Sequence, residues 1–370
     1  MSVVIDLHAH PSLKTWLGGK RLGRRQRAKR GFAPLTLRSS YPSLRAGGVA
    51  VLWSSIYVPE RRLASDCWLL WAASLLVPRL RRAFRAGDPS RIAHEVIDHV
   101  EAEVARVNAD AGAAVIALPR DNGELDAAEA AGKLAFLHTF EGAHVLNGDP
   151  ANVRAFLRRG VCSITLAHFY PNEAAPPVDA IPSDFLLRRL GCFRYREDLD
   201  AGLTSFGAEL VEEMRDVGMI VDLTHATPRA RRDVYALPDP RHRPLVLSHT
   251  GMATLRDHPL NASPEDVRAV AETGGVIGVI LYNHWLAGDR GEDRLDHAVR
   301  HIRELARLGG DDCVAFGSDF DGMTDPPDDL REPAQWPRLI RALEAAGFDS
   351  ARIEKFAYGN ARRVLRDGWV

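Results

Sequence analysis

The stretch VVIDLHAH at residues 3–10 shows the pattern from which the fold can be predicted. It begins with an almost continuously apolar run, which is typical of a parallel strand buried on both faces. It ends in the pair His8 and His10. Residues two apart on an extended strand point to the same face, so both imidazoles could reach one metal ion. The stretch therefore predicts a buried strand with ligand-type side chains at its carboxyl end.

Seven further apolar runs of this kind follow along the chain. With 3–8, the predicted strands are 49–57, 134–141, 161–168, 219–225, 245–249, 276–281 and 313–319, and a ninth run at 113–118 is surplus. Helical patterns lie between them at 90–111, 203–217, 264–273, 294–308 and 335–346. Strand–helix alternation repeated eight times predicts an α/β fold, a (β/α)8 TIM barrel, rather than an open sheet.

A length of 370 residues permits several average domains but also suits one large barrel. We find no sequence repeat and no low-complexity linker, so we predict a single barrel domain over residues 1–370. Two long loops break the alternation, at 11–48 and at 169–202, and the second contains four prolines. Loops at the carboxyl ends of barrel strands build substrate pockets, so we expect both loops to shape the site.

The composition is that of an ordinary globular protein, with 46% hydrophobic and 26% charged residues. A net charge of −1 gives no general electrostatic argument for nucleic acid or an anionic membrane as the main partner. The segment 20–30 is locally basic, and we expect a solvated loop or arginines paired with nearby acids. The alternative, a non-catalytic binding protein that contacts RNA, DNA or acidic lipid through this segment, is the weaker hypothesis.

The four cysteines, Cys67, Cys162, Cys192 and Cys313, are scattered without a CxxC pair. A disulfide framework is therefore not expected. The amino terminus lacks the features of a signal peptide. The most apolar stretch, 67–78, is about half the length needed to span a bilayer. The arginines on both sides of it could suit an interfacial helix, but a helix packed on the body of the protein is the favoured interpretation. These features predict a cytoplasmic protein without a membrane span.

Six predicted strands end in a histidine or a carboxylate. These residues are His8, Glu141, His168, His225, His249 and Asp319, with His10 just beyond the first strand. Because the carboxyl ends of barrel strands converge on one mouth, the pattern predicts a metal site there. Nitrogen and carboxylate ligands favour Zn²⁺, with Mn²⁺, Fe²⁺ or Co²⁺ as alternatives.

The number of ligands suits two ions that share a bridging anion. A carboxylated lysine could bridge them, but none of the five lysines ends a core strand. Glu141 does end one, so it is the candidate bridge.

Seven segments of the chain resemble the membrane (renal) dipeptidases, peptidase family M19. They are TFEGAHVL (139–146), ITLAHFYPN (164–172), LTSFGAELVEEMRDVGMIVDLTHAT (203–227), LVLSHTGM (245–252), HPLNASPEDVRAVAETGGVIGV (258–279), VAFGSDFDGM (314–323) and YGNARRVL (358–365). The match runs in order over nearly the whole chain. The resemblance implies an amidohydrolase-like (β/α)8 barrel with a binuclear zinc site that hydrolyses dipeptides, including many with a C-terminal D-residue.

The resemblance also implies roles for the predicted site residues. Glu141 would bridge two zinc ions, with His225 and His249 on one ion and the pair His8 and His10 on the other. His168 would contact the substrate carbonyl and stabilise the oxyanion. Asp319 would be the acid/base that takes a proton from the attacking water and passes it to the leaving amine.

Two departures from the family pattern affect the expected activity. The first motif is usually H-x-D but reads His8-Ala9-His10 here, which adds one unit of positive charge. The family's R-N dipeptide, whose arginine grips the substrate carboxylate, reads Leu260-Asn261. Leucine cannot make that bidentate contact. We predict Asn261 as a substrate-binding residue and Arg256 as the candidate replacement for the arginine.

These observations leave two enzymatic hypotheses. The first is a zinc dipeptidase; the second is a metal-dependent amidohydrolase that acts on a non-dipeptide small amide or lactone. The expected partner in either case is a small dipeptide-like molecule, with no nucleic acid. Family resemblance also suggests a homodimer, for which the helix with Trp68 and Trp71 is a candidate interface. Asp222 and Asp321 are candidates for orienting the ligands.

Overall fold

The computed structural model describes residues 3–183, 185–287, 294–322 and 325–370. Its strands are β1 (Val4–Ala9), β2 (Val49–Ile56), β3 (Ile116–Ala117), β4 (Leu134–Glu141), β5 (Val161–Thr165), β6 (Ile220–Asp222), β7 (Leu245–Thr250), β8 (Val276–Val279) and β9 (Val314–Phe316). All pair in parallel, in the order β2-β1-β9-β8-β7-β6-β5-β4-β3. β2 also pairs with β4, which closes the sheet into an eight-stranded barrel and leaves β3 outside it.

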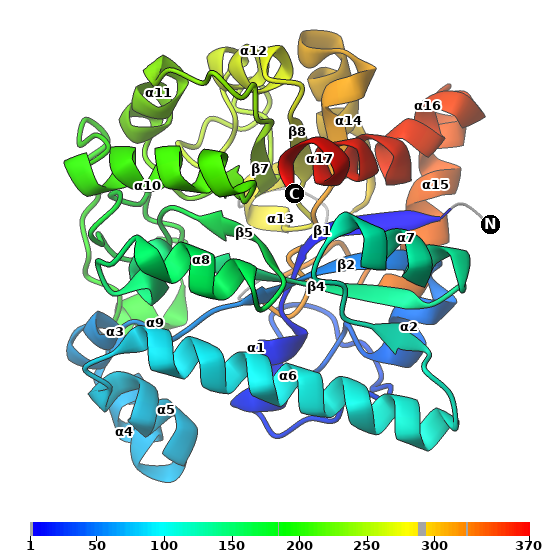
Figure 1. Cartoon of the computed structure of the whole chain (residues 1–370). Helices are drawn as coiled ribbons and strands as arrows, with labels where there is room; N and C mark the ends of the chain where they lie inside the picture. Colours follow the sequence, from blue (N-terminus) through cyan, green and yellow to red (C-terminus); the bar gives the residue numbers. More distant parts are fainter. Residues whose placement is uncertain (1–2, 184, 288–293, 323–324) are drawn as a thin grey trace.

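The closed barrel confirms the predicted (β/α)8 fold, and the helices surround it (Figure 1). The surplus run at 113–118 forms only the two-residue β3, which pairs with β4. Successive residues of each strand alternate between two apolar layers. Ile5 and Val51 belong to one buried cluster, whereas Val4 and Leu52 belong to a second, larger cluster. Burial on both faces explains why the strands read as continuous apolar runs.

The helices that cover the barrel vary in length. They are α1 (Pro11–Trp16), α2 (Tyr41–Ala46), α3 (Arg61–Asp66), α4 (Trp68–Leu76), α5 (Pro78–Arg85), α6 (Pro89–Ala111), α7 (Asn122–Ala130), α8 (Ala151–Leu157), α9 (Leu186–Arg189), α10 (Ser205–Val217), α11 (Pro228–Ala236), α12 (Pro264–Glu272), α13 (Asn283–Leu286), α14 (Asp296–Gly309), α15 (Trp336–Ala345), α16 (Ser350–Glu354) and α17 (Asn360–Gly368). The five predicted helices are present as α6, α10, α12, α14 and α15. Thr204 caps α10 at its start, and Gly218 ends it in a left-handed conformation.

The two long loops are held against the carboxyl-end face of the barrel. In the loop 11–48, the amides of Arg38 and Ser39 each donate to Asp321, at 2.8 Å. In the loop 169–202, the amide of Val178 donates to the carbonyl of His225 at 2.7 Å. Asp321 therefore fastens a loop to the barrel, whereas the sequence had suggested it as a ligand-orienting residue.

Three arginines of the basic segment 20–30 pair with carboxylates. Arg21 lies 3.7 Å from Glu103, Arg25 lies 2.8 Å from Glu332 and Arg30 lies 3.4 Å from Asp328. This is the local pairing with acids that we expected for part of the segment.

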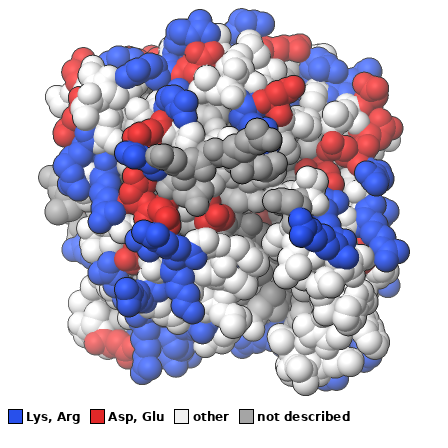
Figure 2. All heavy atoms as spheres, turned by 180° about the vertical axis from the view of Figure 1, so that it is seen from behind, with Lys and Arg blue, Asp and Glu red and all other residues white. Residues whose placement is uncertain are grey.

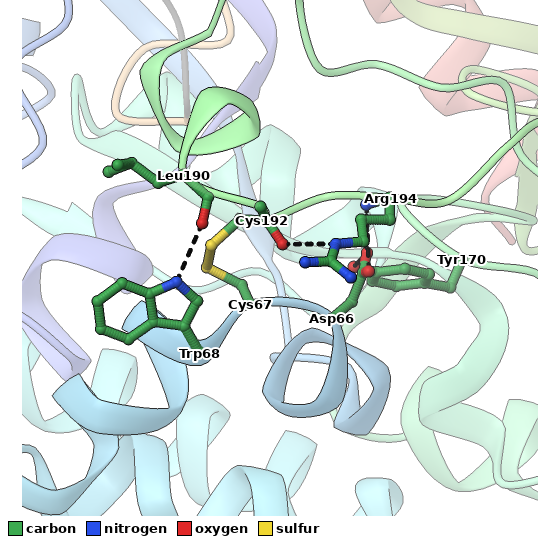
Figure 3. Close-up of a disulfide and its surroundings, with 8 residues drawn as sticks. Asp66, Cys67, Trp68, Tyr170, Leu190, Cys192 and Arg194 are labelled. Carbon is green, nitrogen blue, oxygen red and sulfur yellow. Dashed lines mark hydrogen bonds between the residues drawn. A yellow bond between two sulfur atoms is a disulfide. The ribbon is translucent and has the colours of Figure 1, made fainter.

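Cys67 and Cys192 form a disulfide, which corrects our expectation that disulfides are absent. The two residues are 125 apart in sequence. Cys67 lies between α3 and α4, and the fold brings it to Cys192 in the loop 169–202 (Figure 3). Sequence spacing gave no sign of this pairing because only tertiary packing brings the residues together. Cys162 and Cys313 are buried free thiols. Among the described residues, no helix has the length and apolar character needed to cross a bilayer.

Candidate metal centre

The seven side chains predicted as ligands or catalytic residues gather at one end of the barrel. His8 and His249 lie within β1 and β7, and Glu141 is the last residue of β4. His168, His225 and Asp319 each follow a shorter strand than predicted, three residues beyond the ends of β5, β6 and β9; His10 follows β1 directly. The structure thus brings all seven together.

The Glu141 carboxylate lies at the centre of five imidazoles. Its Oε1 is 3.2 Å from His8 Nε2, 3.2 Å from His225 Nε2 and 3.4 Å from His249 Nε2, and its Oε2 is 3.3 Å from His10 Nε2 and 3.1 Å from His168 Nε2. Two ligands that share one tetrahedral ion at zinc–nitrogen bond lengths lie about 3.3 Å apart. The spacing is therefore that of a metal-ligand set.

Hydrogen bonding within the protein does not account for this arrangement. The Nε2 atoms of His8 and His10 face each other at 2.9 Å, and those of His225 and His249 face each other at 3.1 Å. Only one nitrogen of each such pair can supply the proton of a hydrogen bond, and one carboxylate has about four acceptor sites for its five neighbours. A cation between the nitrogens satisfies all of them, so the donor set fits divalent metal ions.

The candidate ligands fall into three overlapping groups. They are His8, His10 and Asp319; His8, Glu141 and His249; and Glu141, His168 and His225, with the ligand atoms of each group within 4.8 Å of one another. The Asp319 carboxylate reaches the first group through Oδ1, which is 3.4 Å from His10 Nε2. Overlap through His8 and Glu141 means that neighbouring ions could share a ligand.

The electrostatics of the cluster favour a bound cation. Burial alone would raise the pKa of Glu141, but His168, His10 and His8 outweigh it and hold that pKa well below its usual value. Burial likewise opposes a charge on His10, yet Glu141 and Asp319 raise the pKa of His10 to about 10. Burial lowers the pKa of both His168 and His249 well below the usual value, which leaves neutral imidazoles. Ionised carboxylate and neutral imidazole bind metals, so an ion held by His10 would take the place of the proton that Glu141 and Asp319 attract to it.

Buried hydrogen bonds from residues next to the candidate ligands orient some of these ligands. The Ser248 hydroxyl donates to Asp222 and lies 2.9 Å from His249 Nδ1, so Asp222 acts on the ring through Ser248. Asp6 accepts from the amide and the hydroxyl of Ser318, at 2.8 and 2.6 Å, and from the amide of His8 at 3.3 Å. These contacts support the prediction for Asp222 and add Asp6, which the sequence analysis missed.

His225 and Asp319 both adopt left-handed backbone conformations, with φ of 69° and 55°. Such a conformation is costly for a residue other than glycine and persists only where neighbours hold it. The carbonyl of His8 accepts from the Asp319 amide at 2.8 Å, which holds one of them. The sharp turn directs each side chain back toward the centre, and this is why both lie beyond the ends of their strands.

Two residues beside His168 were missed by the sequence analysis. The Tyr57 ring packs edge-on at 4.6 Å from the His168 ring, and Glu60 Oε2 lies 3.9 Å from His168 Nδ1. The Tyr57 hydroxyl donates to Glu60 at 2.9 Å. Burial raises the pKa of Glu60 to about 8, against hydrogen bonds from Tyr57 and Tyr170 that lower it. Their one sequence signal was their place at the carboxyl end of the predicted strand 49–57, where Tyr57 is the last residue and Glu60 follows.

The predicted substrate-binding residues lie on the loop that follows β7. The Asn261 side chain accepts from the Gly251 amide and donates to the carbonyls of Arg256 and Trp285, each at 2.9 Å. It therefore braces this loop, and its role in substrate binding stays a prediction. Leu260 is buried. Arg256 is half-buried, and its Nε has no hydrogen-bond partner within the described part of the chain.

Trp285 connects this loop with the metal centre and was not identified from sequence. Its ring lies 5.9 Å from the His225 ring on one side and stacks at 6.1 Å on His258. Burial lowers the pKa of His258 to about 4, and the nearby charges of His284 and Arg256 add to this effect. Arg256, His258 and Trp285 therefore form a wall that reaches the ligand imidazoles.

Comparison with known proteins identifies, over nearly the whole chain, the same family that the sequence motifs resemble. The family described as membrane dipeptidase, peptidase family M19, matches residues 1–368. An uncharacterized protein of Klebsiella pneumoniae is 34% identical over 64% of this chain and 83% of its own length. An uncharacterized dipeptidase of Schizosaccharomyces pombe is 30% identical over 64% of this chain, and that match spans only 53% of the yeast protein.

A solved structure shows the same fold over the full length. It is a metallopeptidase of Rhodobacter sphaeroides bound to a phosphinate mimic of L-Ala-D-Ala, with 21% identity, a TM-score of 0.78 and complete coverage of both chains. The strand order, the ligand cluster and the family match agree. The chain belongs to the membrane dipeptidase family, peptidase family M19, a family of metal-dependent hydrolases.

Proposed function

We propose that this protein is a dipeptidase that uses two zinc ions. The observation that carries the proposal is the Glu141 carboxylate surrounded by five imidazole Nε2 atoms at 3.1 to 3.4 Å. In this proposal His8 and His10 hold one ion, His225 and His249 hold the other, and Glu141 lies between them. When bound, the ions would lower the pKa of a water and polarise the scissile carbonyl.

Asp319 is the proposed acid/base. Its carboxylate lies on the His10 side of the cluster, and its backbone is fixed by the hydrogen bond to the His8 carbonyl. As a base it accepts a proton from the attacking water, and as an acid it returns that proton to the leaving amine. His168 is proposed to contact the substrate carbonyl and to stabilise the negative charge that develops there. Tyr57 and Glu60 hold its ring in place.

A dipeptide is the substrate that similarity supports, because relatives with this fold include a named dipeptidase and a metallopeptidase bound to a dipeptide mimic. Free dipeptides end in a carboxylate, and a guanidinium group is the side chain that binds carboxylates best. Arg256 is the proposed partner of the substrate carboxylate, because it forms, with His258 and Trp285, the wall that reaches the ligand imidazoles.

A second candidate function has a specific observation in its favour. Leu260 is buried and apolar where the family has an arginine, and the Asn261 side chain makes three hydrogen bonds within the protein, to its own loop and to Trp285. A metal-dependent amidohydrolase for an amide or lactone without a free α-carboxylate would suit such a pocket. Leu260 does not by itself decide between the two functions, because Arg256 could bind the substrate carboxylate in place of the family's arginine.

A substrate panel tests the proposal directly. Protein expressed with added zinc is analysed for bound metal and then incubated with L-L dipeptides, L-D dipeptides, N-acyl amino acids and lactones. We expect about two metal equivalents and turnover of free dipeptides. Turnover of N-acyl compounds or lactones alone would favour the amidohydrolase. Bound transition metal below about one equivalent, with no turnover, would leave a non-catalytic binding protein.

A further inference from the structure

Helix α4 presents apolar side chains to solvent. Trp68 is 57% exposed, Trp71 53%, Leu75 50% and Leu76 87%. Residues at these spacings lie on one face of a helix. The buried residue of α4 is Ser74. Leu69 and Leu70 pack half-buried against the neighbouring core cluster, so α4 is apolar toward the protein and toward solvent, unlike a usual surface helix, whose outer face is polar.

The exposed apolar face continues onto α9. There Leu186 is 64% exposed and Leu190 46%. The Trp68 indole N–H donates to the Leu190 carbonyl at 3.0 Å, and the disulfide between Cys67 and Cys192 joins the two segments (Figure 3). We call Trp68, Trp71, Leu75, Leu76, Leu186 and Leu190 the α4–α9 patch. Its two halves are tied covalently, so it is a continuous, fixed surface.

Unpaired arginines flank the α4–α9 patch. Arg61 on α3, Arg81 and Arg85 on α5, and Arg189 on α9 are exposed, and in the described part of the chain their side chains form no ion pair and no hydrogen bond. From Cys67 to Gly87 the sequence contains four arginines and no Asp or Glu. The lobe that contains α3, α4 and α5 is mostly white in Figure 2, with basic residues along its edges.

We propose that the α4–α9 patch binds the surface of an anionic lipid membrane. Tryptophan and leucine on one face with arginine beside them are the composition of a helix that lies in the membrane interface. Indole rings are favoured at the level of the headgroups, and anionic headgroups attract the unpaired guanidinium groups. The lipid thus supplies an apolar boundary for the α4–α9 patch and negative charges for the unpaired arginines beside it.

A second copy of the chain satisfies the patch less well. In a twofold dimer the same surface meets itself, so the unpaired arginines of both copies would come together. No carboxylate between Cys67 and Gly87 could neutralise them. A large exposed apolar patch marks an interaction site but does not identify the partner. The positive charge beside the α4–α9 patch favours an anionic membrane over a second copy of the chain.

Vesicle sedimentation tests the proposal on the full-length, zinc-loaded protein. Vesicles of phosphatidylglycerol mixed with phosphatidylcholine are compared with vesicles of phosphatidylcholine alone. We expect binding to the anionic vesicles that weakens as salt is raised. The double variant Trp71→Asp, Leu76→Asp should lower that binding at least about tenfold, because it places charges where apolar side chains enter the interface. The double variant Arg81→Ser, Arg85→Ser should reduce the preference for anionic vesicles.

Val3→Asp is the matched control. Val3 is 48% exposed and precedes β1, so it lies at the opposite end of the barrel from α3–α5, which follow the carboxyl end of β2. This variant should bind vesicles like the wild type, and circular dichroism and metal content show that each variant is folded. The proposal is wrong if the wild type does not bind anionic vesicles or if the Trp71 and Leu76 variant binds equally well. It is also wrong if sedimentation velocity shows a wild-type dimer that this variant alone loses.

Discussion

Asp222 holds Ser248 by two hydrogen bonds, one from the Ser248 amide to Oδ1 at 3.1 Å and one from the Ser248 hydroxyl to Oδ2. The hydroxyl also lies 2.9 Å from His249 Nδ1. The carboxylate therefore sets the direction of the His249 ring without touching it. Groups that orient metal ligands in this way contribute strongly to metal affinity.

Asp222→Ala should weaken metal binding by about 10- to 100-fold, because the Ser248 hydroxyl loses the acceptor that orients it. Competition with a chromophoric chelator measures the affinity. Ser248→Ala should shift the affinity in the same direction, and Asp110→Ala, at an exposed position, should leave it unchanged. Wild-type affinity in a folded Asp222→Ala protein would contradict the role.

Asp319→Asn should keep bound metal and lose most turnover. Asparagine retains the shape of the side chain but cannot accept and return a proton, and loss of a general acid/base typically costs about 10²- to 10⁴-fold in rate. Metal analysis and steady-state kinetics on one preparation check both parts. Turnover equal to that of the wild type would show that Asp319 is not the acid/base. Loss of bound metal in the variant would show instead that Asp319 is a metal ligand.

Arg256→Met should raise KM for free dipeptides. The change removes the guanidinium group and keeps much of the apolar stem, so the expected loss is that of one carboxylate contact. Dipeptide amides, which lack the carboxylate, serve as the internal control and should be cleaved as by the wild type. A KM that rises equally for both substrates would show that Arg256 supports the loop rather than the carboxylate.

Thiol titration should find two free cysteines in the unreduced, denatured protein and four after reduction. The two free thiols are Cys162 and Cys313, and the other pair is the disulfide. Cys192→Ser should lower the free energy of unfolding by about 2–4 kcal/mol, because the crosslink restricts the unfolded chain. Four reactive thiols without reduction would contradict the disulfide.

His138→Leu should make stability less sensitive to acid. His138 is buried without hydrogen-bond partners among the described residues, and burial lowers its pKa to about 4. The unfolded state therefore binds a proton below about pH 6.5 that the folded state does not bind, so stability falls as pH drops from 6.5 toward 4. Denaturant unfolding of metal-free protein at several pH values should show a smaller fall for the variant. An unchanged pH dependence would mean that His138 is already charged in the folded state.

The sequence predicted the barrel and the gathering of seven polar side chains at one of its ends, because both depend on a regular pattern. Buried parallel strands must be apolar on both faces, and their carboxyl ends must converge, so Glu141 and His249 could be placed without coordinates. Strand ends were harder to predict. The left-handed turns at His225 and Asp319 shorten β6 and β9, and such turns depend on hydrogen bonds to distant residues.

Residues that act through tertiary contacts were not predictable. Glu60 lies just before α3 and Trp285 lies on the short helix α13, and nothing in their local sequence indicates that they reach His168 or the ligand imidazoles. The partner of Cys67 lies 125 residues away, and no local spacing reveals a pairing of that kind.

The hydrogen bonds between Asp6 and Ser318 join residues 312 apart in sequence. They lie at the seam where the first and last strands of the barrel meet, and the candidate metal ligands lie on both sides of that seam. A centre built across the seam cannot form until the chain has been synthesised at least as far as Asp319, long after His8. Bound ions would link side chains on both sides of the seam and so stabilise the closed barrel. Their removal would thus loosen the whole barrel in one cooperative step, rather than free a single loop.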